Sequence, residues 1–531
     1  MTQVFDRQRR RIAVIPAAVL FGLSLGLAAQ PSMAAPAANG WSVAGQNLRN
    51  TRSQSDQTAL NVNNAGRLAL KWSRTVHGDV SATPAVVDGA VYFPDWGGYL
   101  TKLDAATGKL IWERRIDSYA GEPPSAVSRT SPAVVGNTVY IGDQNGAHVL
   151  AIDAASGNLL WSTAINSHPY AIVTQSPIVH AGVVYVGASS TEEAAAADVP
   201  NYPCCSFRGS FSALDAKTGR IKWTTYTVPQ NNGEPGGYSG GAVWGSTAAI
   251  DVPGKTVFIT TGNNYSVPQS ANQCQVAGGS MAQCLSPDDH VDSVLALDMA
   301  TGRIKWSTGV QGFDTWNIAC NQPGTNAQNC PPSPGPDFDF GAGPTLLTVH
   351  DRPGKPQLLV GAGQKSGVYW LLDAQTGAIR SSTVVGPGSA LGGIEWGTAT
   401  DGKRIYVANA DYDRVPYTVN GKSVTVGSFA AIDPATGKIL WQVADPSGNA
   451  LTIAPVSVSN GVAFVSSMSG HMYALNAATG DVLWDYVGQG SSAAGPAIDE
   501  RGTVYWGNGY AKLGALGTKS YTFYAFSIDG K

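Results

Sequence analysis

Six cysteines are the residues of this chain whose type and spacing most directly predict chemistry. They stand at positions 204, 205, 274, 284, 320 and 330. In an oxidising compartment an even number of cysteines predicts disulfides. Two equal local spacings favour the pairs Cys274–Cys284 and Cys320–Cys330. Adjacent cysteines usually bond elsewhere, because a bridge between neighbours closes a small strained ring. The sequence therefore leaves open whether Cys204 and Cys205 bond to each other or form two longer-range disulfides.

Two cofactor motifs are absent from the sequence, and the overall charge excludes a further class of function. No Cys-x-x-Cys-His occurs, so we expect no c-type haem to be attached to this chain. No Gly-x-Gly-x-x-Gly follows a strand in a βαβ unit, so a nicotinamide cofactor is not implied. Only 13% of the residues are charged and the formal net charge is −3. This composition gives no electrostatic basis for binding nucleic acid.

A ten-residue pattern recurs along the chain and must position any site. Its first copy, residues 103–112, contains Asp104, Gly108 and Trp112 at fixed spacing. A seventh copy, residues 373–381, keeps the turn but has Ser381 in place of the tryptophan. The other copies end at Trp161, Trp223, Trp306, Trp441 and Trp484.

Each copy predicts a β-hairpin. Apolar and small residues before the Asp form one strand, Asp-x-x-Thr-Gly forms a tight turn whose Gly can take a positive φ, and the alternating run that ends in Trp is the partner strand. A second strand pair lies upstream of most copies, for example at residues 85–92 and 132–140. Periods of roughly 40 residues with four short strands each are typical of β-propeller blades.

The number of blades follows from the strands at the two ends. Seven blades are complete within the chain. Residues 502–506 and 521–526 supply strands that lack an outer partner, and residues 68–72 form an outer strand that lacks a blade. Joining these segments closes an eighth blade and leaves no open edge. We predict an all-β, eight-bladed β-propeller whose ring is closed by N- and C-terminal strands.

The N-terminal segment predicts export. Four arginines lie within the first eleven residues, an uncharged and largely apolar run spans residues 12–29, and small residues at 32–34 offer a cleavage site. A membrane anchor is the alternative, but the apolar run is short and Pro16 interrupts it. We predict a signal peptide over residues 1–34, a single propeller domain over residues 35–531, a periplasmic location and no membrane span after cleavage.

The repeat resembles the tryptophan-docking motif of the quinoprotein alcohol dehydrogenases, and the resemblance covers nearly the whole mature chain. It implies a propeller that binds pyrroloquinoline quinone (PQQ) and Ca²⁺ at its axis and oxidises alcohols. The same repeat also builds non-enzymatic propellers, such as the outer-membrane assembly lipoprotein. The repeats alone therefore predict the fold and not the function.

Short segments between the repeats resemble, in order, the segments that build the family's site. Residues 186–192 and 260–263 resemble the segments that supply calcium ligands, here Glu192 and Asn263. Such ligands suit calcium, which prefers oxygen atoms. A cation beside a reducible carbonyl also stabilises the negative charge that develops there. The cofactor contacts that the resemblance implies are Arg129, Thr174, Ser189, Trp244 and Lys365, of which the first two could equally bond within a blade.

The adjacent cysteines depart from the family pattern. Two prolines, Pro123 and Pro124, stand where the family usually has its cysteine pair, and Cys204–Cys205 follows one blade later. That arrangement is similar to the polyvinyl alcohol dehydrogenase branch. A ring formed by Cys204 and Cys205 could cover one face of the cofactor.

The catalytic base is predicted from the reaction and from the resemblance together. Alcohol oxidation by a quinone needs a carboxylate that removes the hydroxyl proton as hydride is delivered. The family places it after the repeat that ends at Trp306, where this chain has Asp337-Phe338-Asp339. We predict Asp337, ahead of Asp339, as the base, with Asp314 as a third choice. Alternatively, the segment is a polar loop, or its second acid favours a larger trivalent cation over calcium.

Three functions remain open at this point. The first is a PQQ- and calcium-dependent dehydrogenase for alcohols, with secondary alcohols or polyvinyl alcohol as substrates and a separate soluble cytochrome c as the electron acceptor. The second is a non-catalytic scaffold propeller of the envelope, which would need a lipid-anchoring cysteine after the signal; none lies there. The third is a quinoprotein sugar or aldehyde dehydrogenase.

Overall fold

The computed structural model describes residues 40–531 except 120, 122, 322–325 and 353–354. The predicted signal peptide, residues 1–34, falls outside these described residues. All of the described residues belong to one compact unit. In the described part of the chain, no helix has both the length and the apolar character that crossing a bilayer requires.

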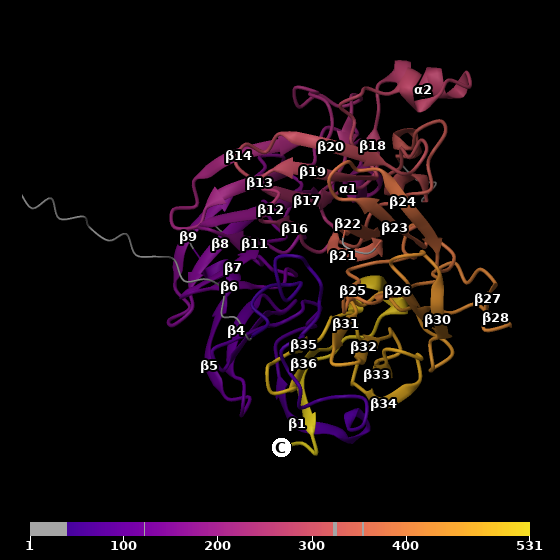
Figure 1. Cartoon of the computed structure of the whole chain (residues 1–531). Helices are drawn as coiled ribbons and strands as arrows, with labels where there is room; N and C mark the ends of the chain where they lie inside the picture. Colours follow the sequence, from indigo (N-terminus) through magenta and orange to yellow (C-terminus); the bar gives the residue numbers. More distant parts are fainter. Residues whose placement is uncertain (1–39, 120, 122, 322–325, 353–354) are drawn as a thin grey trace, which may run out of the picture. The chain divides into compact units, whose positions relative to one another are not determined.

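Successive sheets of antiparallel strands make up this unit (Figure 1). Within the described residues, seven sheets have four strands and one has five, apart from two small two-stranded pairs. The first three strands of each blade are mostly buried and the fourth is largely exposed, as the repeat of apolar and alternating segments requires. The predicted all-β, eight-bladed β-propeller is confirmed.

The blades are numbered in chain order, each from its innermost to its outermost strand. Blade 1 contains β2 (Ala85–Val87), β3 (Ala90–Pro94), β4 (Tyr99–Asp104) and β5 (Leu110–Arg115). Blade 2 contains β6 (Ala133–Val135), β7 (Thr138–Gly142), β8 (His148–Asp153) and β9 (Leu159–Ala164). Blade 3 contains β11 (Ile178–His180), β12 (Val183–Ser190), β13 (Ser210–Asp215) and β14 (Ile221–Tyr226), with β10 (Ala171–Ile172) paired to the end of β12. Blade 4 contains β16 (Ala249–Asp251), β17 (Thr256–Thr260), β19 (Ser293–Asp298) and β20 (Ile304–Gly309).

The second half of the ring repeats this order. Blade 5 contains β21 (Thr345–Arg352), β22 (Lys355–Gly363), β23 (Val368–Asp373) and β24 (Ile379–Val384). Blade 6 contains β25 (Ala399–Thr400), β26 (Ile405–Asn409), β29 (Ser428–Ile432) and β30 (Ile439–Ala444). Blade 7 contains β31 (Ser457–Ser459), β32 (Val462–Ser466), β33 (His471–Asn476) and β34 (Val482–Val487). Blade 8 contains β35 (Ala497–Ile498), β36 (Val504–Gly507), β37 (Thr522–Ile528) and β1 (Leu68–Thr75).

Insertions between the blade strands carry the remaining elements. The paired strands are β15 (Ser239–Gly240) with β18 (Asn264–Ser266), and β27 (Tyr417–Val419) with β28 (Lys422–Val424). The helices are α1 (Glu192–Asp198), α2 (Gln269–Val276) and α3 (Met281–Cys284), with 3-10 turns at Ala65–Arg67, Ile116–Ser118, Ile318–Cys320, Ala327–Asn329 and Ala511–Leu516. A disulfide between Cys274 and Cys284 joins α2 to α3, and Cys320–Cys330 closes the next insertion, as their spacing predicted.

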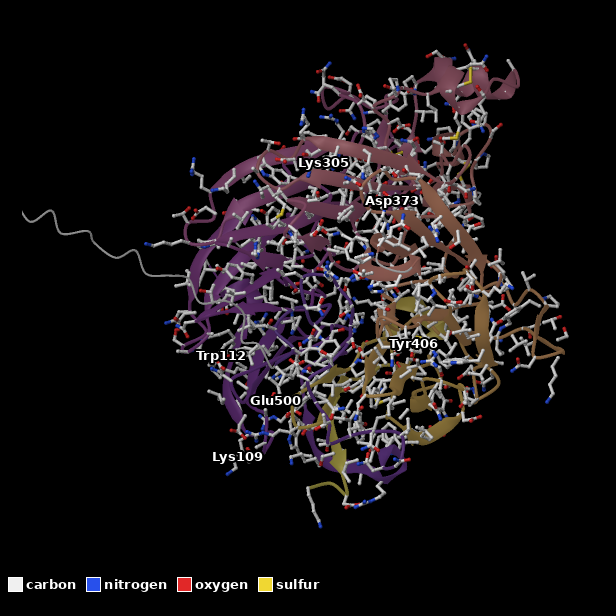
Figure 2. The ribbon with its side chains drawn as sticks, viewed as in Figure 1. Lys109, Trp112, Lys305, Asp373, Tyr406 and Glu500 are labelled. Carbon is white, nitrogen blue, oxygen red and sulfur yellow. A yellow bond between two sulfur atoms is a disulfide. The ribbon has the colours of Figure 1, made fainter. Side chains whose placement is uncertain are left out.

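Each tryptophan of the repeat docks onto the following blade. Nε1 of Trp112, labelled in Figure 2, donates to the carbonyl of Ala154 at 3.1 Å. Its ring packs on Gly157, where an added Cβ would lie 3.0 Å from the ring. Gly157 also has φ +74°, so both its conformation and this close approach require glycine. The same bond to the next blade is made by Trp72, Trp161, Trp223, Trp306, Trp441 and Trp484.

The two ends of the described chain close the ring in blade 8. Strand β1 pairs with β37 from Leu68↔Ile528 to Thr75↔Thr522 (Figure 1). Nε1 of Trp484 in blade 7 donates to the carbonyl of Leu68 at 2.8 Å, so the first strand also completes the last docking contact. The predicted closure by N- and C-terminal strands is confirmed.

The segment from Trp41 to Gln54 lies along the innermost strands. In its course it bonds to seven of the eight blades that the described residues form. Arg52 of this segment is 2% exposed and donates to the carbonyls of Val456 and Ala44 and to the hydroxyl of Thr83. The blade residues that this segment contacts are Val86, Val134, Ile250, Leu346, Thr400, Val458 and Ile498.

Candidate functional site

A cavity lies where the chain enters the innermost strands of several blades. Because these entry points repeat around the ring, residues far apart in the sequence converge there. Arg52 of the N-terminal segment also lines this axial cavity. The blade residues that line it include Thr83, Arg129, Ser131, Thr174, Ser176, Ser246, Trp396 and Pro455.

Two of the predicted cofactor contacts, Arg129 and Thr174, line the axial cavity. The Arg129 guanidinium lies 4.1 Å above the ring of Trp396. The Thr174 hydroxyl is buried and has no hydrogen-bond partner among the described residues. A buried hydroxyl without a partner costs free energy, which favours a ligand that would bond to it.

Trp396 is a site residue that the sequence analysis missed. Its ring lies 5.4 Å from that of Trp244, at 73°. A shared local pattern could have revealed it: residues 242–247 (Ala-Val-Trp-Gly-Ser-Thr) and 394–398 (Ile-Glu-Trp-Gly-Thr) both place a Trp-Gly pair shortly before an innermost strand. Trp396 and Arg129 line the cavity, and Trp244 packs against Trp396.

Lys365 is buried between two carboxylates beside Trp244. Its Nζ lies 3.0 Å from Asp337 Oδ1, 3.5 Å from Asp339 Oδ2 and 5.3 Å from the centre of the Trp244 ring. Burial by itself lowers the pKa of Lys365, but the charges of Asp337 and Asp339 outweigh it and raise the pKa well above its usual value. Lys365 therefore stays protonated, as a donor to groups that bind here.

Asp339 and Asp337 have different surroundings. Both oxygens of Asp339 accept hydrogen bonds, from the Asn263 backbone N–H at 2.6 Å and from Trp244 Nε1 at 2.8 Å. Asp337 has φ +59°, an uncommon conformation for a residue other than glycine. Burial, reinforced by the charges of Asp339 and Glu193, raises its pKa well above the usual value although Lys365 opposes the shift.

Asp314 holds the backbone of this acidic segment in place. Its two oxygens accept the N–H groups of Asp337 at 3.0 Å and Phe338 at 2.7 Å. Burial raises its pKa to about 6. With both oxygens occupied by backbone donors, Asp314 positions Asp337. The structure thus brings Asp314, Asp337, Asp339 and Lys365 into one cluster.

Asn263 presents a buried oxygen to this cluster. Its Nδ2 donates to the carbonyls of Asn264 at 3.1 Å and Trp316 at 2.9 Å, and these two bonds fix which amide atom is the nitrogen. Its Oδ1 is buried and has no hydrogen-bond partner in the described chain. An amide oxygen held in this way suits a cation that prefers oxygen ligands.

Glu192, which the sequence predicts to be a metal ligand, has protein partners at both of its carboxylate oxygens. Its carboxylate accepts hydrogen bonds from the Tyr202 hydroxyl and from the backbone N–H groups of Ser206 and Phe207, each at 2.8 Å. His168 Nε2 also lies 3.3 Å from it. Protein donors therefore satisfy both oxygens, and Glu192 joins α1 to the loop that follows it.

The neighbouring Glu193 faces the charged cluster instead. It interacts electrostatically with Lys365 and Asp339, and burial is the main cause that raises its pKa above the usual value. Glu395, next to Trp396, is buried; burial raises its pKa to about 7, and its Oε2 has no partner within the described residues. Neither acid was identified from the sequence.

The adjacent cysteines form a disulfide with each other. Cys204 Sγ lies 3.6 Å from Asn317 Nδ2, and the carbonyl of Cys205 accepts from Ser266 Oγ at 3.4 Å. Both cysteines and Trp244 belong to or pack against the same apolar cluster.

Ser189, which the sequence predicts to contact the cofactor, is almost fully buried in β12, where it pairs with Ile172.

Two family models match the chain. The model described as the β-propeller domain of glucose, ethanol and alcohol dehydrogenases matches residues 163–327. The model described as outer membrane protein assembly factor BamB matches residues 34–203 and 365–520. The repeats thus match the scaffold protein as well as the enzymes, whereas only the enzyme model covers the segment that contains Trp244 and Asn263.

Relatives of known name extend this similarity over most of the chain. A polyvinylalcohol dehydrogenase of Sphingopyxis sp. is 31% identical over 93% of this chain and 76% of its own length. A polyvinylalcohol dehydrogenase of Pseudomonas sp. is 30% identical over 93% of this chain and 77% of its own. The solved structure of quinohemoprotein alcohol dehydrogenase from Comamonas testosteroni shares the fold, with a TM-score of 0.69 at 21% identity over 93% of this chain and 81% of that one.

Proposed function

Since this chain belongs to the PQQ-dependent alcohol dehydrogenase family, we propose that it oxidises alcohols with PQQ and a calcium ion bound at the axis. One observation carries the proposal. A buried lysine, two aspartates and an unpartnered amide oxygen converge beside a cavity lined by aromatic rings and arginines. A scaffold propeller would gain nothing from burying such a cluster, because buried charges are costly.

The residues of the axial cavity fit a flat cofactor that carries carboxylates. Arg52 and Arg129 line the cavity. Burial lowers the pKa of Arg52 to about 9, so its guanidinium remains charged at neutral pH. The Trp244 and Trp396 rings offer surfaces for a planar group, and the Thr174 hydroxyl lacks a partner in the described chain. We assign Arg129, Thr174, Trp244, Trp396 and Lys365 to cofactor binding.

The cation site in this proposal combines Asn263 Oδ1 with the carboxylate of Glu193. Among the described residues, no three His, Cys, Asp or Glu side chains come together to hold a metal by themselves. Amide and cofactor oxygens must therefore complete the coordination, which suits calcium. The acids around Lys365 add negative charge, so a trivalent cation is the second candidate.

The protein side of the reaction follows from the same contacts. Bound PQQ supplies the electron acceptor for the hydride of the alcohol. Asp337 accepts the hydroxyl proton, with its backbone held by Asp314 and its carboxylate by Lys365. Asp339 orients Trp244 and the backbone of Asn263. We propose a periplasmic location, secondary alcohols or polyvinyl alcohol as substrates, and a separate cytochrome c as the electron acceptor.

Reconstitution tests this function directly. Purified apoprotein incubated with PQQ and Ca²⁺ should gain dye-linked oxidation of alcohols, and a chelator added before the quinone should prevent it. Parallel assays with a trivalent cation in place of calcium decide the metal, and assays with sugars and aldehydes decide the substrate class. If adding PQQ produced neither activity nor a spectral change, the result would favour a non-catalytic scaffold propeller.

Trp244 provides a second test, which concerns cofactor binding. Trp244→Ala removes the aromatic ring and the donor to Asp339, so PQQ affinity should fall by about tenfold or more. Trp244→Phe keeps a ring and should retain part of the affinity. Quinone titration of the apoprotein measures both effects. Thermal melting of each variant with and without PQQ is the control: an equal loss of stability in the two states would make Trp244 a core residue only.

A further inference from the structure

Arg52 carries a buried positive charge that no acidic side chain balances among the described residues. Its guanidinium donates to carbonyls and hydroxyls rather than to carboxylates. These acceptors belong to Ala44, Thr83, Val456 and Ser457. Burial lowers the pKa of Arg52, and within the described chain no acidic neighbour offsets this shift. A buried charge without a counter-charge is costly, so the surroundings of Arg52 favour an anion.

The wall of the axial cavity carries a second positive charge, Arg129. The nearby acid Glu395 interacts with Lys365 first and with Arg129 more weakly. Glu395 does not itself line the cavity, and neither does any other Asp or Glu that the structure describes. The cavity therefore has two cationic side chains on its wall and no carboxylate.

The hydroxyl groups of this wall are placed as hydrogen-bond donors. Five serine and threonine hydroxyls each accept one hydrogen bond from an N–H group. A hydroxyl that accepts a bond still has a hydrogen to donate, and these five have no acceptor for it in the part of the chain that the structure describes. They are Ser81, Thr83, Ser131, Ser176 and Ser246.

Bonds from blade to blade hold these hydroxyls in place. The backbone N–H of Thr83 donates to Ser131 Oγ at 3.0 Å, and the N–H of Ser131 donates to Ser176 Oγ at 2.9 Å. The Thr174 hydroxyl, on the same wall, is buried and bonds to none of the described residues. Donors that are fixed before binding lose little entropy when a ligand arrives.

The size of the axial cavity suits a small ion. Its volume is about 40 Å³. A cavity of about 10–15 Å³ already holds one water molecule, so the space is sufficient for a monatomic ion. Bulky organic anions are excluded by the same volume.

From the unbalanced charge of Arg52, the donating hydroxyls and the small volume, we infer that the axial cavity binds one small monovalent inorganic anion, such as chloride. Arg52 belongs to the segment from Trp41 to Gln54, which bonds to seven blades of the described ring. The anion thus fastens this segment to the inner strands. The inference goes beyond the proposed function, because it needs neither quinone nor metal.

Thermal melting of protein free of quinone and metal tests the inference. The protein is first dialysed into sodium gluconate, whose anion is too bulky for a cavity of about 40 Å³. Bromide then replaces gluconate at constant ionic strength. Above its dissociation constant, each tenfold rise in bromide should raise the melting temperature by about 1–2 °C, because the anion binds only the folded chain. A melting temperature that does not depend on bromide refutes the inference.

Thr174→Val is the most informative variant, because it keeps the shape of a side chain whose hydroxyl bonds to no described residue. It should fold and should raise the dissociation constant for bromide by about tenfold or more, the value of a hydrogen bond to a charged group. Thr174→Ser keeps the hydroxyl and should keep the affinity. Ser389→Ala is the matched control, since it removes a buried unpartnered hydroxyl that does not line the cavity.

Arg52→Gln removes the charge and should abolish the response to bromide. If that variant does not fold, the comparison of Thr174→Val with Thr174→Ser and Ser389→Ala still decides the matter. If every folded variant responds as the unmodified protein does, bromide acts on the protein surface as a whole and the inference is overturned.

Crystals grown in bromide locate the ion directly. The anomalous scattering of bromine should show one ion beside Arg52 in the quinone-free protein, and bromide found only on the surface would overturn the inference. A carboxylate of a bound molecule offers the same chemistry, so the experiment is repeated after loading with PQQ. Retained or displaced bromide then identifies the anionic group beside Arg52 in the loaded protein, and both results support the site. Bromide binding without alcohol oxidation would refute only the proposed function.

Discussion

Replacing Asp337 with asparagine should lower turnover by about a hundredfold or more, the usual contribution of a general base. The substitution preserves size and removes only the proton acceptor. Cofactor binding should survive, because Asp314 would still hold the backbone N–H groups of residue 337 and Phe338. Steady-state kinetics of the reconstituted enzyme, with PQQ content determined by its absorbance, measure both properties.

Asp339→Asn is the matched control for Asp337→Asn. Both carboxylate oxygens of Asp339 already accept hydrogen bonds, from Asn263 and Trp244. The variant should therefore change metal or quinone affinity more than it changes proton transfer. If Asp339→Asn loses turnover with normal affinities while Asp337→Asn is active, the roles are reversed. If both variants turn over normally, Asp314 becomes the next carboxylate to replace.

The pH dependence of these variants follows from the direction of the Asp337 pKa. Burial raises that pKa, so the ionised form that can accept a proton appears only as the pH rises through the raised value. The kcat/KM of the unmodified enzyme should therefore increase with pH in this window. Asp337→Asn should lack this step and recover some rate only at higher pH, where alcohol ionisation becomes easier.

Glu193→Gln should raise the dissociation constant for calcium by about a hundredfold, because it removes a charged ligand. Loss of an indirect contact typically weakens metal binding by about 10–100-fold, and loss of a direct ligand should weaken it at least as much. Glu192→Gln is its matched control one residue earlier. Glu192 is satisfied by Tyr202, Ser206 and Phe207, so its variant should keep calcium affinity and lower the melting temperature. Calcium titration of the quinone-loaded proteins distinguishes the two.

The opposite outcome of that comparison is equally informative. A loss of calcium affinity in Glu192→Gln with none in Glu193→Gln would mean that the loop around α1 rearranges when the metal binds. The assignment of Glu193 would then be wrong, and the original expectation from the sequence would hold.

The fold could be predicted from the sequence because it repeats. Each Asp-x-x-Thr-Gly turn needs a residue with positive φ, and most of the docking tryptophans pack on the glycine of such a turn, so the same physical requirement recurs along the sequence. The closure of blade 8 was also predictable, since the strands near residues 70 and 524 each lacked a partner. The structure confirms both.

The site was only partly predictable, because it depends on the directions in which side chains point, and the spacing of residues in the sequence does not specify these directions. Glu192 and Glu193 begin the same helix, and adjacent helical residues point about 100° apart, so Glu192 bonds to the following loop while Glu193 interacts electrostatically with Lys365 and Asp339. Trp396 and Glu395 lie outside the repeated pattern. The bond between Cys204 and Cys205 could not be chosen from the sequence either, since both pairings were consistent with six cysteines.

The pairing of β1 with β37 has a consequence for how the chain reaches its native state. The first strand of the ring has no partner until Thr522–Ile528, almost the last residues, have been synthesised. Contacts between such distant segments form late, because a long loop must be closed before they contribute. Until β37 has been made, β1 lacks its partner and can pair with wrong strands.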